Sequence, residues 1–385
     1  MDVLAIRDLA AAHRDGYVAA LRAMVNIDSG TFNRAGVNRI ADLCEARFRE
    51  RGWDVERIGD VPGAGPALGD TVVGTLRGAG GPRVLMIGHM DTVFDDGTAS
   101  ERPFSVRGDR AYGPGASDMK GGLLSGFFAA DVLREAGFDA FERITYVCNP
   151  DEEIGSPSSS ETIRRLAAGH DAALILESGR PNGAIVSSRK GTTDYVIRIH
   201  GRAAHAGVEP DEGRSAVIEA AHKAIEIADI HGRWPGVTCN VGVLRGGTRS
   251  NVVAEEAVLE VDLRAPELAT LEEAKRAIEA VCARPAMDGV TISVRVEGSH
   301  QPMEKTPGSR RLVDAAVAVA GELGFALSDT ATGGASDGNT TSAAGCPTLD
   351  GLGPVGGGAH SRDEWLDLES VVPRIALLAG VITRR

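Results

Sequence analysis

The sequence predicts an α/β protein in which a second, smaller domain is inserted into the first. Short apolar runs at residues 84–87, 141–148 and 172–176 have the pattern of strands buried on both faces, and helical segments lie between them. From about residue 188 the pattern changes to the alternation typical of a half-exposed sheet, and after residue 298 the first pattern returns. We therefore expect one domain from residues 1–187 and 299–385, with residues 188–298 inserted.

Length and composition agree with this organisation. A chain of 385 residues suggests two or three domains, and 43% hydrophobic with 25% charged residues is ordinary for a soluble globular protein. The net charge of −13 argues against nucleic acid as a partner. We expect no signal peptide and no membrane span, because no long apolar run is present. Five scattered cysteines without a CxxC pair indicate reduced thiols and a cytoplasmic protein.

The elements of the first domain follow from apolar spacing. Three- and four-residue spacing predicts helices over residues 6–27 and 38–51, and residues 72–76 form a candidate strand. A glycine-rich loop over residues 111–122 leads into a predicted helix, 123–136. After the inserted domain, helices are predicted over residues 309–323 and 371–382.

Polar residues follow the predicted buried strands directly. His89 and Asp91 follow the first run, Glu152 and Glu153 the second, and Glu177 the third. Ligand sites of open α/β sheets lie at these strand ends. Taken alone, a histidine there is more often structural than a metal ligand, and Asp118, at the start of a helix, has the residue type of a helix cap.

Together these residues suit two divalent cations. A pair of cations needs a bridging carboxylate and nitrogen or oxygen ligands on both sides. Histidine and carboxylate ligands without a thiolate favour Zn²⁺, with Co²⁺ or Mn²⁺ as replacements. Because consecutive side chains point in different directions, one of Glu152 and Glu153 can bind metal while the other acts as a base. A second glycine-rich loop ends at His360 and brings a further ligand type.

The inserted segment has the order β-α-β-β-α-β, which is that of a ferredoxin-like unit. Its first strand-to-helix loop contains His205. The expected strands are residues 193–200, 238–244, 257–264 and 290–296, and the expected helices are residues 215–228 and 271–282.

The sequence resembles the di-zinc metallopeptidase and amidohydrolase family that includes glutamate carboxypeptidase of the carboxypeptidase G type, acetylornithine deacetylase, succinyl-diaminopimelate desuccinylase and aminoacylase. This resemblance covers nearly the whole chain. It implies a zinc-peptidase-like three-layer α/β/α catalytic domain with an inserted ferredoxin-like dimerisation or lid domain. The matching blocks, in the family's order, are Gly88–Val93, Gly113–Gly122, Asp151–Gly155, Glu177, His205–Gly207, Gly333–Asp337 and His360–Ser361.

The resemblance implies a role for each matching residue. Two Zn²⁺ per subunit are expected, bridged by Asp118, and Asp118 is expected to precede a cis peptide to Met119. The general base is Glu152, and Asp91 orients His89. From the smaller domain, His205 would stabilise the oxyanion, often in the partner subunit's site. The other expected metal ligands are His89 and Glu177 on one zinc and Glu153 and His360 on the other, and the expected substrate contacts are Asn251 and Arg264.

The expected function is a metal-dependent amide hydrolase, either a carboxypeptidase or an N-acyl-amino-acid deacylase. Its partners would be a small substrate with a free carboxylate and a second copy of the chain in a homodimer. The alternatives are a biosynthetic deacylase of the acetylornithine or succinyl-diaminopimelate type and, from another class, a non-catalytic relative used for binding or dimerisation. Glutamate-releasing relatives have an Arg-Pro pair where this chain has Ser299-His300-Gln301-Pro302, so this chain lacks a cation that would bind the glutamate carboxylate. The sequence therefore does not identify the amino acid that is released.

Overall fold

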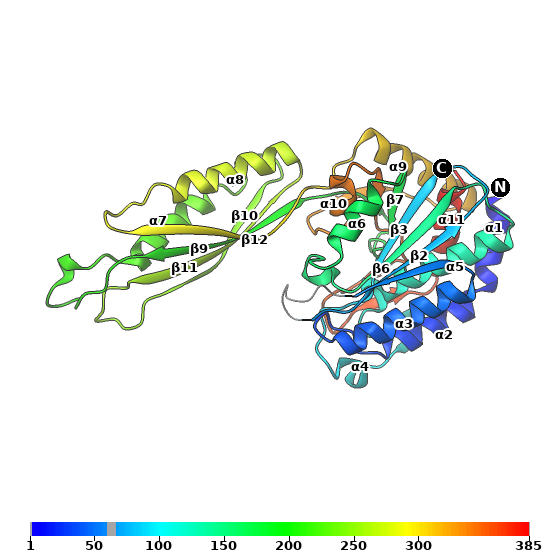
Figure 1. The fold of residues 1–385 in the computed structure, drawn as a ribbon, viewed down its shortest axis with the longest axis horizontal. Coiled ribbons are helices and arrows are strands. Elements are labelled where there is room, and N and C mark those ends of the chain that lie inside the picture. Colours follow the sequence, from blue (N-terminus) through cyan, green and yellow to red (C-terminus); the bar gives the residue numbers. More distant parts are fainter. Residues whose placement is uncertain (1, 60–66, 385) are drawn as a thin grey trace. The chain divides into compact units, whose positions relative to one another are not determined.

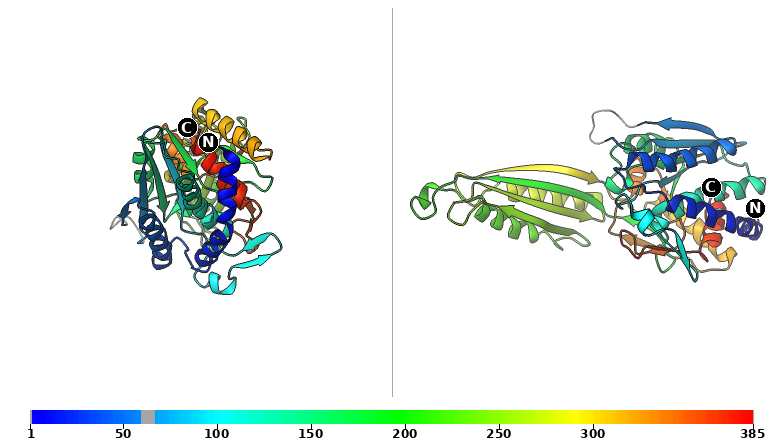
Figure 2. Two further views of the ribbon diagram at one scale, coloured as in Figure 1. Left: turned by 90° about the vertical axis from the view of Figure 1, so that its right-hand side faces the viewer. Right: turned by 90° about the horizontal axis from the view of Figure 1, so that it is seen from below.

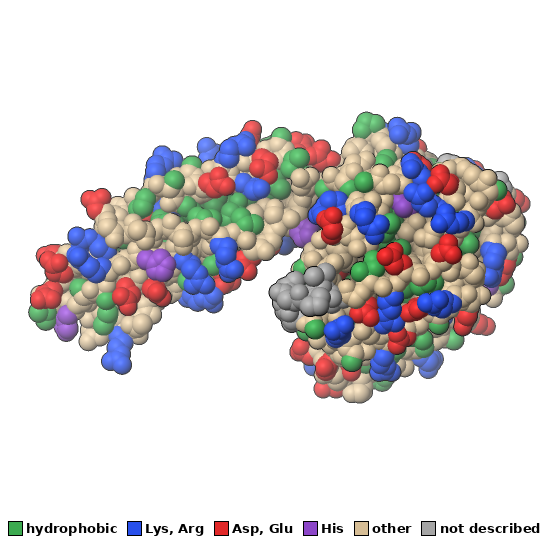
Figure 3. All heavy atoms as spheres, viewed as in Figure 1, with side chains coloured by type: hydrophobic (Ala, Val, Ile, Leu, Met, Phe, Trp, Pro, Cys, Tyr) green, Lys and Arg blue, Asp and Glu red, His purple; other side chains and the backbone are tan. Residues whose placement is uncertain are grey.

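The computed structural model describes residues 2–59 and 67–384. The chain forms two compact units (Figures 1 and 2). The first consists of Met1–Ser187, Lys305–Thr332 and Ser336–Arg385, and the second of Ser188–Glu304 with Gly333–Ala335. Acidic and basic side chains are interspersed over the face of each unit that Figure 3 shows, so the excess of acids is not gathered into one patch there.

A six-stranded sheet forms the centre of the first unit, with the order β1-β2-β6-β3-β7-β14. Strands β3, β6, β7 and β14 are parallel to one another. At one edge of the sheet, β2 pairs antiparallel with β6, and β1 pairs antiparallel with β2. The predicted runs at 84–87, 141–148 and 172–176 correspond to the buried strands β3, β6 and β7. The strand bounds are Asp54–Ile58 (β1), Thr71–Arg77 (β2), Arg83–His89 (β3), Arg143–Asn149 (β6), Ala172–Ile175 (β7) and Thr348–Leu349 (β14).

Helices cover both faces of this sheet, as the β3 side chains show. Val84 and Met86 belong to the larger core cluster with α1, α3, α5, α9 and α11, whereas Leu85 and Ile87 pack in a smaller cluster with α6. The predicted α/β fold of three layers is confirmed. The helices are Val3–Ala12 (α1), Arg14–Val25 (α2), Arg34–Glu50 (α3), Thr98–Glu101 (α4), Gly121–Glu135 (α5), Ser160–Ala167 (α6), Pro307–Leu323 (α9), Asp337–Ala343 (α10) and Val371–Ile382 (α11).

One helix prediction was wrong. The segment 6–27 does not form a single helix, because the chain bends at His13 between α1 and α2. After this bend, α1 packs on α11, α9 and α5, and α2 also packs on α5. The His13 ring pairs with Glu135 of α5 at 3.0 Å. Several short strands were also not predicted: β1 and β14 of the central sheet, and β4 (Ser105–Arg107), β5 (Arg110–Tyr112), β8 (Ile185–Arg189), β13 (Asp329–Thr332), β15 (Gly356–Gly357) and β16 (Trp365–Asp367).

The second unit is a four-stranded antiparallel sheet, ordered β10-β11-β9-β12, with two helices packed on one face. Its chain order, β9-α7-β10-β11-α8-β12, is the predicted β-α-β-β-α-β. The alternating burial of β9 places Tyr195, Ile197 and Ile199 under the helices. The bounds are Gly191–His200 (β9), Ala216–Ala228 (α7), Thr238–Gly246 (β10), Glu256–Ala265 (β11), Leu268–Cys282 (α8) and Thr291–His300 (β12).

Candidate metal centre

The carboxyl ends of β3, β6 and β7 meet at one edge of the first unit's sheet. In the register of these parallel strands, His89 lies opposite Asn149, and Ile87 lies opposite Ile175. The turn with Glu152 and Glu153 and the residue Glu177 therefore emerge beside His89. Parallel strands that end together explain why acids distant in sequence gather here.

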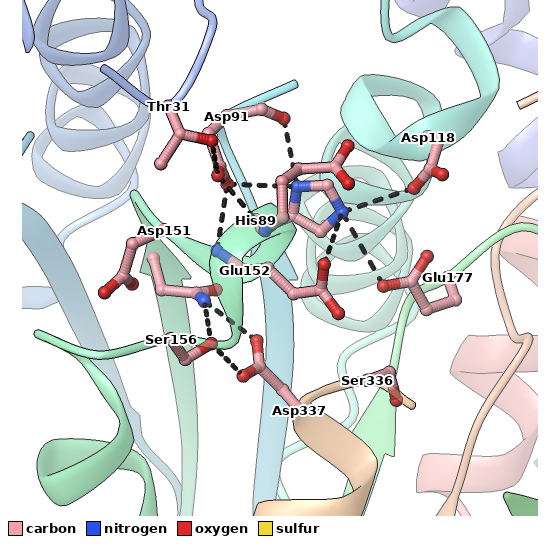
Figure 4. Close-up of polar contacts among 12 residues, drawn as sticks. Thr31, His89, Asp91, Asp118, Asp151, Glu152, Ser156, Glu177, Ser336 and Asp337 are labelled. Carbon is pink, nitrogen blue, oxygen red and sulfur yellow. Dashed lines mark hydrogen bonds and ion pairs between the residues drawn. The ribbon is translucent and has the colours of Figure 1, made fainter. Parts of the chain in front are cut away.

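His89 lies at the centre of this group and is fully buried. Its Nε2 atom is 3.3 Å from Asp118 Oδ1, 3.6 Å from Glu177 Oε1 and 4.0 Å from Glu152 Oε2 (Figure 4). On the other side of the ring, Nδ1 is 3.3 Å from Asp91 Oδ1. Burial opposes the imidazolium, but the hydrogen bonds to Asp118 and Asp91 outweigh it and raise the pKa of His89 well above its usual value.

Asp118 lies between two histidines. Its Oδ1 faces His89, and its Oδ2 is 3.3 Å from His360 Nε2. The Asp118–Met119 peptide bond is cis. Burial opposes ionisation, but the hydrogen bonds from His360 and His89 outweigh it and lower the pKa of Asp118. A carboxylate with each oxygen toward a different histidine has the arrangement that a bridging ligand needs.

The second histidine pairs with Glu153. His360 Nε2 lies 3.1 Å from Glu153 Oε2, and the hydrogen bonds to Asp118 and Glu153 raise the pKa of His360 to about 10. The other oxygen, Glu153 Oε1, is buried without a hydrogen-bond partner among the described residues. An orphaned carboxylate oxygen at such a position fits a cation ligand.

Glu152 points toward His89 and Glu177 (Figure 4). Burial raises the pKa of Glu152 well above its usual value, and repulsion from Glu177, Asp337 and Glu153 adds to this effect although His89 opposes it. The ligand atoms of His89, Glu152 and Glu177 lie within 4.8 Å of one another, as do those of His89, Asp118 and Glu153. This donor set contains only nitrogen and oxygen, and so it fits divalent cations such as Zn²⁺, Mn²⁺ or Co²⁺.

Asp91 does more than face His89. Its Oδ1 and Oδ2 accept hydrogen bonds from the backbone N–H groups of Glu152 and Glu153, each at 3.2 Å. The Thr31 hydroxyl donates to Asp91 Oδ2 at 2.7 Å. The His89 Nδ1 atom is also 3.0 Å from the backbone carbonyl oxygen of Asp91. Asp91 thus holds the His89 ring through its backbone carbonyl and its carboxylate, and the carboxylate also fixes the turn that carries the two glutamates.

The family model for peptidase family M20/M25/M40 matches residues 85–384. The chain belongs to this family. It is 31% identical over 368 residues to carboxypeptidase G2 of Pseudomonas sp. (strain RS-16), covering 95% of this chain and 88% of that protein. It is 29% identical over 355 residues to acetylornithine deacetylase of Shigella sonnei, and the match covers 87% of this chain and 88% of that protein. The predicted family resemblance is confirmed.

Solved structures show the same fold. Aminopeptidase PepT from Bacillus cereus superposes with a TM-score of 0.79 at 24% identity, covering 96% of this chain and 98% of that one. An M20 family metallo-carboxypeptidase from Sulfolobus solfataricus gives 0.75 at 16% identity, covering 95% and 98%. This M20/M25/M40 chain is thus a hydrolytic enzyme that acts on amide bonds, and enzymes of this family use divalent metals. The alternative of a non-catalytic relative is therefore set aside.

Three of the predicted site residues belong to the second unit. His205 and Asn251 are neighbours there, because the Ala206 N–H donates to the Asn251 carbonyl and His205 pairs with Val252. Arg264 is bound within the same unit, 2.8 Å from Asp262 and 2.9 Å from the Gly333 carbonyl oxygen. An Arg at this position can serve either an ion pair within the unit or a substrate contact, and the structure shows the ion pair, so the substrate contact of Arg264 stays a prediction.

The sequence did not point to several residues that support the centre. Asp337, at the start of α10, accepts hydrogen bonds from Ser156 at 2.6 Å and Asn149 at 2.8 Å, and burial raises its pKa to about 6. Asp337 is the last residue of the family block Gly333–Asp337, and this position could have indicated a role at the centre. Thr31 had no such signal, because only the fold brings it to Asp91.

Glu364 holds the loop that carries Asp118. Although it is buried, it accepts hydrogen bonds from three backbone N–H groups: Ser117 at 2.8 Å, Asp118 at 3.0 Å and Gly115 at 3.1 Å. Burial raises the pKa of Glu364 to about 7, while these donors stabilise its ionised form. Because His360 lies four residues away, one C-terminal segment contacts both the backbone and the carboxylate of Asp118.

Replacing Glu364 by Gln is expected to weaken metal binding about 10–100-fold, as loss of a group that orients a ligand does. An amide has one acceptor oxygen, and its NH₂ group would face a backbone N–H. Titration with Zn²⁺, compared with the exposed control Glu369→Gln, measures the change. Equal metal affinity in the two variants would contradict this role.

Proposed function

We propose that this enzyme hydrolyses the amide bond of a small substrate with a free carboxylate, as a carboxypeptidase or an N-acyl-amino-acid deacylase. The observation that carries the proposal is the group of His89, Asp118 and Glu177 with Glu153 and His360, beside Glu152, which this assignment leaves free to act as a base. The names of the relatives, a carboxypeptidase and a deacetylase, support this substrate class.

We further propose that the centre holds two Zn²⁺, one bound by His89 and Glu177, the other by Glu153 and His360, with Asp118 between them. Cations bound there would lower the pKa of a water molecule and polarise the amide carbonyl. Co²⁺ or Mn²⁺ would fit the same donors.

In this proposal Glu152 moves the proton. Its carboxylate takes a proton from the attacking water and delivers it to the nitrogen of the leaving amine. The position of Glu152, with its Oε2 atom 4.0 Å from His89 Nε2 and outside the assigned ligand set, supports this role. The exposed His205 would stabilise the negative charge on the carbonyl oxygen, with Asn251 and Arg264 at the substrate's carboxylate. We also propose that the second unit mediates a homodimer and that His205 acts in the partner's site.

A hydrolysis screen tests the proposed function. Purified protein with Zn²⁺, Co²⁺ or Mn²⁺ is expected to release free amino acid from N-acyl amino acids or dipeptides. A chelator should abolish the activity, and added metal should restore it. Activity that survives removal of all metal, or acts only on substrates lacking a carboxylate, would overturn the proposal. Sedimentation as a monomer would remove the trans role of His205.

The same screen tests the alternative of a biosynthetic deacylase of the acetylornithine or succinyl-diaminopimelate type. That alternative predicts a marked preference for acetyl or succinyl groups over other acyl groups.

Among residues 2–59 and 67–384, no helix is both long and apolar enough to cross a membrane. The cytoplasmic location stays a prediction.

A further inference from the structure

A hollow of about 580 Å³ adjoins the candidate metal centre within the first unit. One wall is the segment after α2, which includes Phe32, and the other is the segment after β3, from Thr92 to Asp96. The metal-ligand candidate Glu153 and its neighbour Ile154 complete the lining. Its volume lies in the range of pockets that bind drug-sized molecules. A substrate whose amide bond lies at the metals therefore has space beside Glu153.

Backbone contacts hold the two walls together. The Thr31 N–H donates to the Thr92 carbonyl at 3.1 Å, and the Thr92 N–H donates to the Ser29 carbonyl at 2.8 Å. Gly30 has no space for a side chain, because a Cβ there would lie 2.3 Å from the Phe94 carbonyl oxygen. Thr31 also donates to Asp91, which binds the turn of Glu152 and Glu153. The hollow is thus fixed in position relative to the reacting groups.

The hollow presents large apolar side chains to solvent. Phe32 is 64% exposed, Val93 42% and Ile154 40%. Single exposed apolar residues need no explanation, but three around one hollow beside an active site indicate a binding surface for an apolar group.

The charges decide which half of the substrate fits. Of the residues described around the hollow, none is Lys or Arg, whereas Asp95 and Asp96 are acidic, and the third acid, Glu153, is a candidate metal ligand. The nearby Arg102 stacks on the Phe94 ring at 4.7 Å and donates to the Arg362 carbonyl. A carboxylate would therefore be repelled from this hollow. The half of the substrate that fits is the one without the carboxylate, which is the acyl group.

We propose that this hollow binds the acyl group and selects large uncharged acyl groups, aromatic or long aliphatic, over acetyl and succinyl. This inference rests on the proposed function and names its substrate class. Burial of an apolar acyl group against Phe32, Val93 and Ile154 favours the large groups. Repulsion from Asp95 and Asp96 disfavours a second carboxylate.

The test compares acetyl, hexanoyl, benzoyl and succinyl derivatives of one amino acid. The metal-loaded enzyme should have a kcat/KM for the benzoyl and hexanoyl compounds at least about tenfold above that for the acetyl compound. In Phe32→Ala the benzoyl-to-acetyl ratio should fall about tenfold, and it should fall less in Val93→Ala. The control Val317→Ala, at a 41% exposed valine on α9, should leave the ratio unchanged. Equal kcat/KM for all acyl groups would overturn the inference. An equal fall of the benzoyl-to-acetyl ratio in Val93→Ala and Val317→Ala would also overturn it.

A charge variant tests the second half of the inference. Asp95→Asn should raise the kcat/KM for the succinyl compound several-fold relative to the acetyl compound, whereas Asp314→Asn on α9 should not. If Asp95→Asn leaves that ratio unchanged, the acids of the hollow do not set the selectivity.

Calorimetry separates this inference from the proposed function. The Glu152→Gln variant should bind the N-benzoyl compound at least about tenfold more tightly than the N-acetyl compound, and Phe32→Ala in that background should remove the difference. If the wild-type enzyme hydrolyses no N-acyl amino acid, the proposed function fails, but this difference in binding still supports the hollow. No difference in binding would overturn the hollow as an acyl site, whatever the turnover.

Discussion

Replacing Glu152 by Gln is expected to lower kcat at least about a hundredfold while leaving the metal content of the protein unchanged. General acid–base catalysis contributes about 10²–10⁴-fold, and Gln cannot accept or deliver the proton. The side-chain shape is kept, and the backbone N–H of residue 152 still reaches Asp91. Metal analysis and steady-state kinetics with the best substrate of the screen measure both quantities.

The matched control is Glu161→Gln, an exposed acid on α6 in the same stretch of chain, which should leave kcat at the wild-type value. Full turnover in Glu152→Gln would mean that another group moves the proton. A variant that lost its metal together with its activity would instead place Glu152 among the metal ligands. Its Oε2 atom, 4.0 Å from His89 Nε2, is close enough for that role.

Replacing Gly122 by Ala is expected to destabilise the first unit by about 1–3 kcal/mol or more and to lower its metal content. A Cβ at this position of α5 would lie 1.7 Å from the Leu176 carbonyl oxygen, and Leu176 precedes the ligand candidate Glu177. Because that contact is with backbone, relief requires α5 or the end of β7 to move. Denaturant unfolding and metal analysis check the two effects.

Gly321→Ala on α9 is the control, since a Cβ there meets no atom within 4 Å. This change should be neutral or slightly stabilising, because Ala is favoured over Gly inside helices by about 0.5–1 kcal/mol. If Gly122→Ala unfolds at the same denaturant concentration as Gly321→Ala and keeps its metal, the close packing of α5 against Leu176 does not hold Glu177 in place.

The sequence predicted the parts of the site that depend on local pattern. Apolar runs predicted β3, β6 and β7, and residues next to a strand end are positioned by that strand, so the places of His89, the Glu152–Glu153 pair and Glu177 could be predicted from their order. Their division into ligands and base came from the family resemblance and stays a prediction. Asp118 was found through its glycine-rich loop and the family's motif.

The supporting contacts could not be predicted, because they join residues far apart in sequence. Glu364 reaches Asp118 across 246 positions, and Asp337 reaches Asn149 across 188. Neither residue lies in an apolar pattern or at the end of a predicted strand. The break at His13 was missed for a similar reason, since it depends on which helices α1 and α2 pack against.

The division of the first unit between two stretches of chain has a consequence for biosynthesis. His89, Asp118 and the glutamates leave the ribosome before the second unit, whereas His360 and Glu364 follow it. A nascent chain therefore carries a cluster of acids whose second histidine has yet to be synthesised. The set of candidate ligands is complete only after the segment that carries His360 and Glu364, which follows the second unit in the chain, has packed onto the earlier part of the first unit.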